Sequence, residues 1–160
     1  MVEQATDKLE FLDLTQERAA QYADALLSFS RDAEWENWTI ENLMSERPSK
    51  WDLSVVVVSN GCPVGYGICS DRETSAHVHH FVVSPECRSR GVGKLLLRRL
   101  AAKALDAGFE RMTLKVHTPN ERAVRFYENN SMKITGEENG LYWMSGRSID
   151  ILGARDGKRE

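Results

Sequence analysis

The stretch that decides the fold runs from residue 82 to residue 95 and reads Val82-Val83-Ser84-Pro85-Glu86-Cys87-Arg88-Ser89-Arg90-Gly91-Val92-Gly93-Lys94-Leu95. An apolar strand ends at Ser84-Pro85, a basic turn with two glycines follows, and a long helix begins. Glycines let successive backbone N–H groups converge on one point, and a helix N-terminus adds the positive end of its dipole. With the cations of Arg88, Arg90 and Lys94, these amides would cradle a diphosphate.

Two other phosphate-binding motifs are excluded by the same residues. A P-loop needs Ser or Thr after the Gly-Lys pair, but Leu95 follows Gly93-Lys94. A Rossmann fingerprint needs glycine three residues after Gly93, where Leu96 stands. The segment alone therefore leaves the phosphate ligand open.

The rest of the chain alternates strand and helix patterns. We expect strands at 8–14, 54–58, 64–69, 75–83, 112–116, 132–135 and 141–145, with a hairpin turn at Asn60-Gly61. Helices are predicted at 15–28, from a Thr39 cap to before Pro48, at 91–107, and from a Thr118 cap, with Pro119 at the first helical position, to about residue 129. This order predicts an α/β (α+β) fold, a mixed sheet covered by helices.

Composition narrows the class of protein. The 160 residues suit a single domain (1–160), with a core at about 8–148 and a polar tail at 153–160 that we expect to fray. The chain has neither a long apolar run nor a signal-like start, so we expect a cytoplasmic protein without a membrane partner. Cys62, Cys69 and Cys87 form no C-x-x-C pair, which favours reduced thiols. The net charge of −3 argues against a nucleic-acid partner.

Two segments together resemble one family. Arg88-x-x-Gly91-x-Gly93 after a Val-Val-Ser-Pro strand resembles the acyl-CoA pyrophosphate motif of the GNAT acetyltransferase superfamily. Val116-His117-Thr118-Pro119-Asn120, continuing through Ala123 and Phe126-Tyr127 to Met132, resembles the closing motif of that family. The element order also agrees, so the likeness covers roughly residues 8–148.

The resemblance implies a GNAT-like fold, whose mostly antiparallel sheet has helices on both faces and splays into a V between strands 75–83 and 112–117. It also implies acetyl-CoA as the acyl donor, with no metal. The implied cofactor-binding residues are Phe81, Val82 and Val83 through their backbone, then Arg88, Ser89, Arg90, Gly91, Val92, Gly93 and Lys94 around the diphosphate, with Asn120 and Phe126 near the pantetheine arm. Tyr127 is the implied acid that serves the thioester sulfur.

His77 and His79 are the candidates for the base. Strand alternation predicts that His77, His79 and Phe81 point to one face and Val78, His80 and Val82 to the other. An imidazole that titrates near neutrality suits removal of a proton from an ammonium. The run Ala76-His77-Val78-His79 also resembles the histidine strand of the arylalkylamine acetyltransferases. Many family members carry Glu here or on the next strand, where this sequence has Lys115, and a purely structural role for both histidines stays open.

The acceptor pocket in this fold is usually shaped by the first two helices and their connection. There, Glu34, Trp35 and Trp38 are candidates to bind an aromatic or cationic amine, or merely to hold the helix on the sheet. We expect a small-molecule amine as the acceptor. A peptide or protein amine, a non-catalytic acyl-CoA-binding protein and a homodimer remain open. A metal site formed by His77, His79 and His117 lacks a completing ligand.

Overall fold

The computed structural model describes residues 8–31, 38–88 and 90–153. Its centre is one seven-stranded sheet in the order β1-β2-β3-β4-β5-β7-β6. All neighbouring strands are antiparallel except β4 and β5, which are parallel, so the predicted mixed sheet is confirmed. The strands are β1 (Leu9–Asp13), β2 (Val55–Ser59), β3 (Cys62–Asp71), β4 (Ala76–Val83), β5 (Arg111–His117), β6 (Lys133–Glu138) and β7 (Leu141–Arg147).

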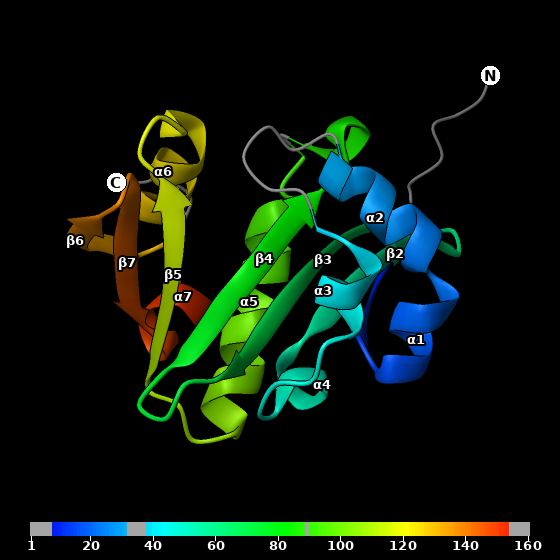
Figure 1. Cartoon of the computed structure of the whole chain (residues 1–160), viewed down its shortest axis with the longest axis horizontal. Helices are drawn as coiled ribbons and strands as arrows, with labels where there is room; N and C mark the ends of the chain where they lie inside the picture. Colours follow the sequence, from blue (N-terminus) through cyan, green and yellow to red (C-terminus); the bar gives the residue numbers. More distant parts are fainter. Residues whose placement is uncertain (1–7, 32–37, 89, 154–160) are drawn as a thin grey trace.

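Helices cover both faces of the sheet and enclose two apolar cores (Figure 1). On one face lie α1 (Gln16–Gln21), α2 (Ala23–Arg31) and α3 (Ile40–Met44). On the other lie α5 (Val92–Asp106), α6 (Glu121–Glu128) and α7 (Ser148–Leu152). The short α4 (Lys50–Leu53) contributes Trp51 to the first core and Leu53 to the second. A 3-10 turn, η1 (Pro85–Cys87), follows β4.

The helix predicted at 15–28 is two helices. Thr15 caps α1 as predicted, accepting a hydrogen bond from the Arg18 amide at 3.1 Å. The chain then leaves helical geometry at Tyr22, whose ψ is 8°, before α2 begins. The Thr39 cap is confirmed and forms a capping box with Asn42. The helices α4 and α7 were not predicted, because each is a single short turn with little periodicity to detect.

The predicted cap at Thr118 is wrong. The Thr118 amide donates to the Gly140 carbonyl at 3.0 Å, which keeps Thr118 beside the β6–β7 turn. Asn120 caps α6 instead, and its side-chain oxygen accepts from the Ala123 amide at 3.2 Å. Asn is at least as favourable an N-cap as Thr, so a start at Asn120 costs the helix nothing in capping.

A β-bulge in β4 overturns part of the predicted side-chain alternation. Ile68 pairs with His80, but the next residue, Cys69, pairs with Val78, so His79 is an extra residue in its strand. Beyond the bulge the faces exchange. Phe81 therefore packs in the α5 core with Val78, whereas Val82 packs in the α2 core.

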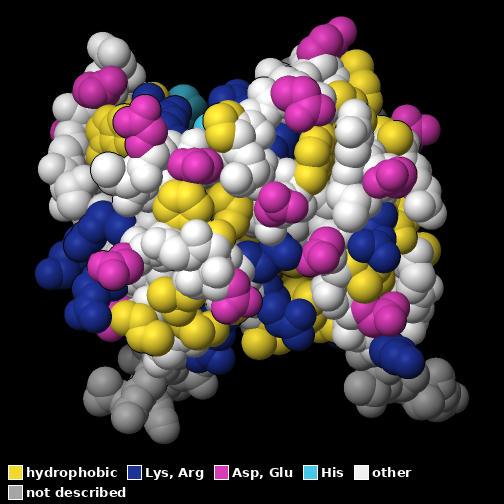
Figure 2. Space-filling view, turned by 90° about the horizontal axis from the view of Figure 1, so that it is seen from below, with side chains coloured by type: hydrophobic (Ala, Val, Ile, Leu, Met, Phe, Trp, Pro, Cys, Tyr) yellow, Lys and Arg dark blue, Asp and Glu magenta, His cyan; other side chains and the backbone are white. Residues whose placement is uncertain are grey.

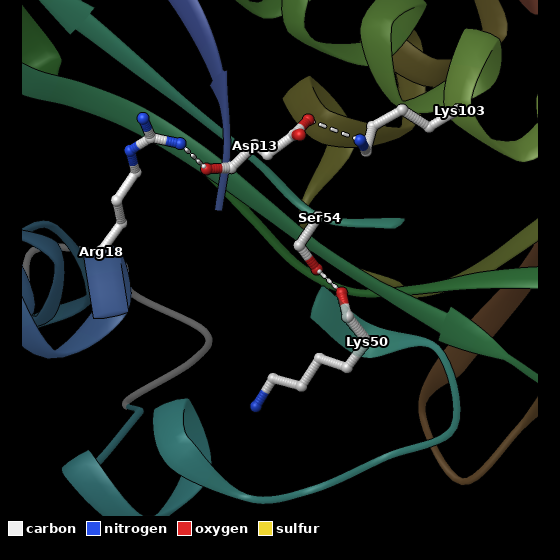
Figure 3. Close-up of polar contacts among 5 residues, drawn as sticks. All are labelled: Asp13, Arg18, Lys50, Ser54 and Lys103. Atoms are coloured by element: carbon white, nitrogen blue, oxygen red, sulfur yellow. Dashed lines mark hydrogen bonds and ion pairs between the residues drawn. The ribbon is translucent and has the colours of Figure 1, made fainter. Parts of the chain in front are cut away.

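Polar contacts fasten the N-terminal elements to the sheet (Figure 3). The Lys103 ammonium of α5 lies 2.6 Å from the Asp13 carboxylate at the end of β1, and this hydrogen bond lowers the pKa of Asp13. Arg18 donates to the Asp13 carbonyl at 2.9 Å, and the Ser54 hydroxyl donates to the Lys50 carbonyl at 2.7 Å. On the lower face, acidic and basic side chains are interspersed with apolar ones (Figure 2).

Candidate active site

The sheet opens between its two parallel strands. β4 and β5 pair only through Ala76–Met112, His77–Thr113 and Val78–Leu114, and beyond that they diverge (Figure 1). A cleft occupies the divergence. Its lining residues come from β4, from β5 and from α6 with its N-cap: Val78, His79, His80, Phe81, Val82, Leu114, Lys115, Val116, His117, Asn120, Ala123 and Tyr127. The predicted V-shaped splay is thus present.

The second half of β4 has a strand neighbour on one side, β3. There, Phe81 lies opposite Gly67 and Val83 opposite Gly65. The edge of these residues that faces β5 borders the cleft, so an extended ligand could add to it as a strand does. The Arg88 side chain folds back to this edge, where its Nε donates to the Val83 carbonyl at 3.0 Å.

The basic turn leads into α5 as predicted. Gly91 is the N-cap residue with φ of 83°, a left-handed conformation that favours glycine. The first amide bonded within the helix is that of Leu95, to the Gly91 carbonyl at 3.1 Å. The preceding amides, those of Val92, Gly93 and Lys94, point out of the helix end as at any N-terminus. Ser89 lies outside the described residues, and Arg90 is exposed in the turn.

Gly93 has a packing role that the sequence did not reveal. A Cβ at this position would lie 3.3 Å from two ring atoms of Phe126, so the helix end and the α6 aromatic meet closely because residue 93 has no side chain. Phe126 in turn lies 5.7 Å from Phe81 between ring centroids. The glycine of the turn, α6 and β4 therefore form one packed unit beside the cleft.

Tyr127 is buried and lines the cleft. Its ring meets Phe126 and Phe81 edge-on, at centroid distances of 5.2 and 6.0 Å. Asn120 lines the same cleft while its oxygen caps α6. The two residues that the closing motif suggested are thus brought together with the open edge of β4.

His77 and His79 lie together on the sheet face away from α5, as predicted. Their ring centroids are 4.8 Å apart. The Nδ1 of His77 lies 2.8 Å from the Thr113 hydroxyl, and the Nε2 of His79 lies 2.6 Å from the Ser70 hydroxyl. His79 lines the cleft, whereas His77 is only 4% exposed.

Neither imidazole titrates near neutrality, which corrects the expectation. Burial, followed by the charges of Arg72, Lys115 and Arg47, lowers the pKa of His77 to about 4. Burial and the adjacent His77 lower the pKa of His79 to about 3. Both rings are therefore neutral at physiological pH, able to accept a hydrogen bond but weakly basic.

The predicted acceptor residues are only partly described. Glu34 and Trp35 lie outside the described residues. The half-buried Trp38 stacks on His80 with ring centroids 4.3 Å apart and an interplanar angle of 6°, and its amide donates to Ser30. This packing supports the structural alternative for Trp38 and for the buried His80.

Sequence reasoning missed the polar partners of the histidines. Ser70, His77, Thr113 and Ser145 lie opposite one another across β3, β4, β5 and β7. Trp143 lies 5.6 Å from the His77 ring, and Lys115 lies 4.7 Å above the Trp143 ring. The sequence could show only that Thr113 and Lys115 lie on the same face of one strand. The register between strands, which brings these residues to His77, cannot be read from the sequence.

Among the described residues, no group of three or more His, Cys, Asp or Glu side chains is arranged to hold a metal ion. None of the described helices has the length and apolar character to cross a bilayer. The three cysteines are unpaired, and burial raises the pKa of Cys69 to about 12.

Comparison with known proteins agrees with this geometry. Peptidyl-lysine N-acetyltransferase YjaB of Salmonella typhimurium is 31% identical over 97 residues, covering 61% of this chain and 61% of that protein. Thialysine N-epsilon-acetyltransferase of Bos taurus is 31% identical over 72 residues, covering 42% of each chain. This chain thus matches less than two thirds of the length of these relatives.

The fold has solved counterparts. The PaiA N-acetyltransferase of Thermoplasma acidophilum, solved in complex with coenzyme A, superposes with a TM-score of 0.74 at 18% identity, covering 88% of this chain and 99% of that one. A model of the acetyltransferase (GNAT) family matches residues 12–131. The chain belongs to the acetyltransferase (GNAT) family.

Proposed function

We propose that this protein transfers an acetyl group from acetyl-CoA to the primary amine of a small molecule. The observation that carries the proposal is the cleft between β4 and β5, which is bordered by an open strand edge and by Tyr127, while Gly93 of the turn into α5 packs on the neighbouring Phe126. Family membership supports the acyl donor, because relatives with this fold are N-acetyltransferases.

The residues at the cleft fit coenzyme A. The amides of Val92, Gly93 and Lys94 and the side chain of Arg88 suit the diphosphate, because a helix N-terminus favours anions. The edge of Phe81–Val83 suits the pantetheine amides by strand addition. Asn120 and Phe126 flank the arm. When bound, the thioester supplies an activated acetyl carbonyl.

Direct transfer needs a neutral amine. Its nitrogen attacks the thioester carbonyl carbon, an N–C bond forms, the C–S bond breaks, and the thiolate takes a proton. A β4 amide at the bulge would polarise the carbonyl oxygen, and the buried Tyr127 hydroxyl would donate to the departing sulfur. The attacking nitrogen then loses a proton, and it has become far more acidic than the free amine.

We infer that His79, rather than His77, faces that nitrogen. His79 lines the cleft, whereas His77 is almost fully buried and bonded to Thr113. With a pKa of about 3, His79 is neutral throughout the physiological range. A neutral, weakly basic His79 can accept a hydrogen bond from the attacking nitrogen and pass its proton to water. It is a poor base for deprotonating a free ammonium.

A protein acceptor is the second candidate. It is favoured by the name of a relative, a peptidyl-lysine N-acetyltransferase. In Figure 1, helices α1 to α3 lie over the β1–β4 part of the sheet, and that face of β5 and β7 is left open by them. An open face of this kind suits a peptide as well as a small amine.

Thiol release with acetyl-CoA tests the proposal. We expect turnover with small amines, and turnover confined to lysine peptides would favour the second candidate instead. Calorimetry should measure the affinity for coenzyme A in parallel with the turnover assay. Tight binding without turnover would identify an acyl-CoA-binding protein, and absence of binding would refute both enzymatic functions.

A further inference from the structure

The face of the sheet beside the cleft bears a contiguous set of polar and aromatic side chains, which is buried at Ser70 and His77 and half-buried at its other members. We call it the acceptor shelf and define it by Ser70, His77, Thr113, Lys115 and Trp143. Its members touch: His77 bonds Thr113, its ring lies 5.6 Å from Trp143, and Lys115 lies over the Trp143 ring. Ser70 lies opposite His77 in the strand register. Lys115 also lines the cleft, so the shelf and the cleft are continuous.

The charges that act on this shelf are cationic. Lys115, Arg72 and Arg47 lower the pKa of His77, and Arg47, Arg72 and Lys50 lower that of His79, in each case after burial. Among the described residues, no carboxylate acts in the opposite sense on either imidazole. Lys115 is half-buried and lines the cleft, so a ligand in contact with it meets its charge where water screens that charge less than at the open surface.

A carboxylate does border the shelf. The exposed Glu138 accepts a hydrogen bond from the Trp143 indole at 3.4 Å. This bond orients Trp143 from its outer edge, while Lys115 covers the ring face. The carboxylate of Glu138 is in water and strongly screened, so Lys115 stays the half-buried charge nearest the cleft.

A positive shelf discriminates among amines. It repels a second ammonium, as in a diamine, and it lowers the pKa of the reacting ammonium, which favours the neutral nucleophile. It attracts a carboxylate. Lys115 is placed to hold one within reach of the cleft, and the Trp143 ring offers an apolar floor for the chain in between.

Resting on the function proposed above, we propose that the acceptor is an amine that also carries a carboxylate, as a free amino acid does. The carboxylate pairs with Lys115 on the acceptor shelf. The amine then points to the thioester beside His79. Lys115 is thus a specificity-determining residue and takes no part in the chemical step.

Acceptor pairs that differ only in the carboxylate test this inference. Lysine against cadaverine, tyrosine against tyramine and tryptophan against tryptamine are compared by kcat/KM for thiol release. We expect the carboxylated member to be favoured about tenfold or more, which corresponds to about 1.4 kcal/mol. Lys115→Gln should abolish the preference by raising KM for the carboxylated member alone.

Lys8→Gln is the matched control. Lys8 is exposed just before β1, and three strands, β2, β3 and β4, separate β1 from β5, so its removal should leave every ratio unchanged. Preference for the decarboxylated amines, turnover of peptides only, or an equal loss for both members in Lys115→Gln would overturn the inference while the acetyltransferase function stands. No turnover with any amine or peptide would instead refute the function, and the inference with it.

Discussion

The Nε2 atom of His79 and the hydroxyl of Ser70 lie 2.6 Å apart, across the β3–β4 pair at the bulge. This bond engages one ring nitrogen and thereby restrains the ring plane. The bulge makes the contact possible, because His79 is the extra residue that β4 inserts opposite β3. Ser70 is therefore a positioning residue for the imidazole that faces the proposed acceptor.

Ser70→Ala should lower kcat about tenfold while KM for acetyl-CoA stays unchanged, because His79 loses its orientation and the coenzyme loses nothing. Ser70→Thr keeps the hydroxyl and should restore most of the rate. Ser75→Ala is the control, since Ser75 contacts Thr113 and not His79. Steady-state kinetics measures kcat and KM separately for each variant. Equal effects of the Ala and Thr variants would mean that Ser70 contributes only packing.

Tyr127→Phe should reduce kcat by roughly a hundredfold or more, because a positioned acid supplies about 10²–10⁴-fold, and coenzyme A affinity should stay nearly intact. The ring contacts with Phe81 and Phe126 survive the change because only the hydroxyl is removed. Tyr142→Phe is a matched control, as Tyr142 packs against the same core from β7 without lining the cleft. Single-turnover kinetics and calorimetry make the comparison. Unchanged turnover in Tyr127→Phe would remove Tyr127 from the chemistry.

Acid should destabilise the protein through the two histidines. Their pKa values fall from 6.5 in the unfolded chain to about 4 for His77 and about 3 for His79 in the fold. Above pH 6.5 both states hold neutral rings and full stability. Below it the unfolded chain binds protons that the fold rejects, so the free energy of unfolding falls as the pH drops from 6.5 toward 3.

Urea denaturation at pH 7.5, 6 and 5 measures that slope. The double variant His77→Gln/His79→Gln should have a shallower slope than the native chain, whatever its stability at pH 7.5. An identical slope in both proteins would show that the histidine pKa values are not depressed in solution.

The sequence predicted most of the sheet and the glycine-containing turn into α5 for a physical reason. Strand ends, glycines and caps are local signals, and the Val82–Leu95 stretch contains all three. The hairpin turn at Asn60-Gly61 is also a local signal, because both residues adopt positive φ, 52° and 85°, which this pair tolerates well. Such features depend on neighbours in the chain.

What could not be predicted depends on register. One inserted residue, His79, exchanged the faces of Phe81 and Val82, and no local signal marks a bulge between two apolar runs. The contacts of His77 with Thr113 and Trp143 join strands that are 36 or more residues apart in the chain. Pairing at that distance is decided by tertiary packing.

The two glycines at the start of α5, Gly91 and Gly93, should respond differently to replacement by alanine. Gly91→Ala places a Cβ in open space but strains the backbone at φ of 83°, so it should cost about 1 kcal/mol of stability. Gly93→Ala keeps an ordinary backbone but presses on the Phe126 ring at 3.3 Å, so it should weaken acetyl-CoA binding more than it lowers Tm. Calorimetry and thermal denaturation separate the two effects. Equal loss of affinity and stability in both variants would contradict this division of roles.

Lys50 is the buried cation on which the α3–α4 connection depends. It is 1% exposed, and its ammonium donates to the Leu43 and Ser45 carbonyls, both at 2.6 Å, at the C-terminal end of α3. Lys50→Met fills a similar volume but leaves those carbonyls without a donor, which should cost about 2–4 kcal/mol at pH 7.

The pH dependence of stability isolates this lysine from simple packing loss. Burial, and secondarily Arg47, lowers the pKa of Lys50 from 10.5 to about 8. Between pH 8 and 10.5 the unfolded chain therefore binds a proton that the fold releases, so Lys50 makes stability rise with pH across that window. Lys50→Met should abolish this rise, whereas Lys133→Met, at an exposed position, should retain it. Denaturant midpoints at pH 7 and 9.5 measure this rise in stability. If the rise persists in Lys50→Met, another group causes it. Lys50 would then contribute to stability only through its hydrogen bonds to the two carbonyls.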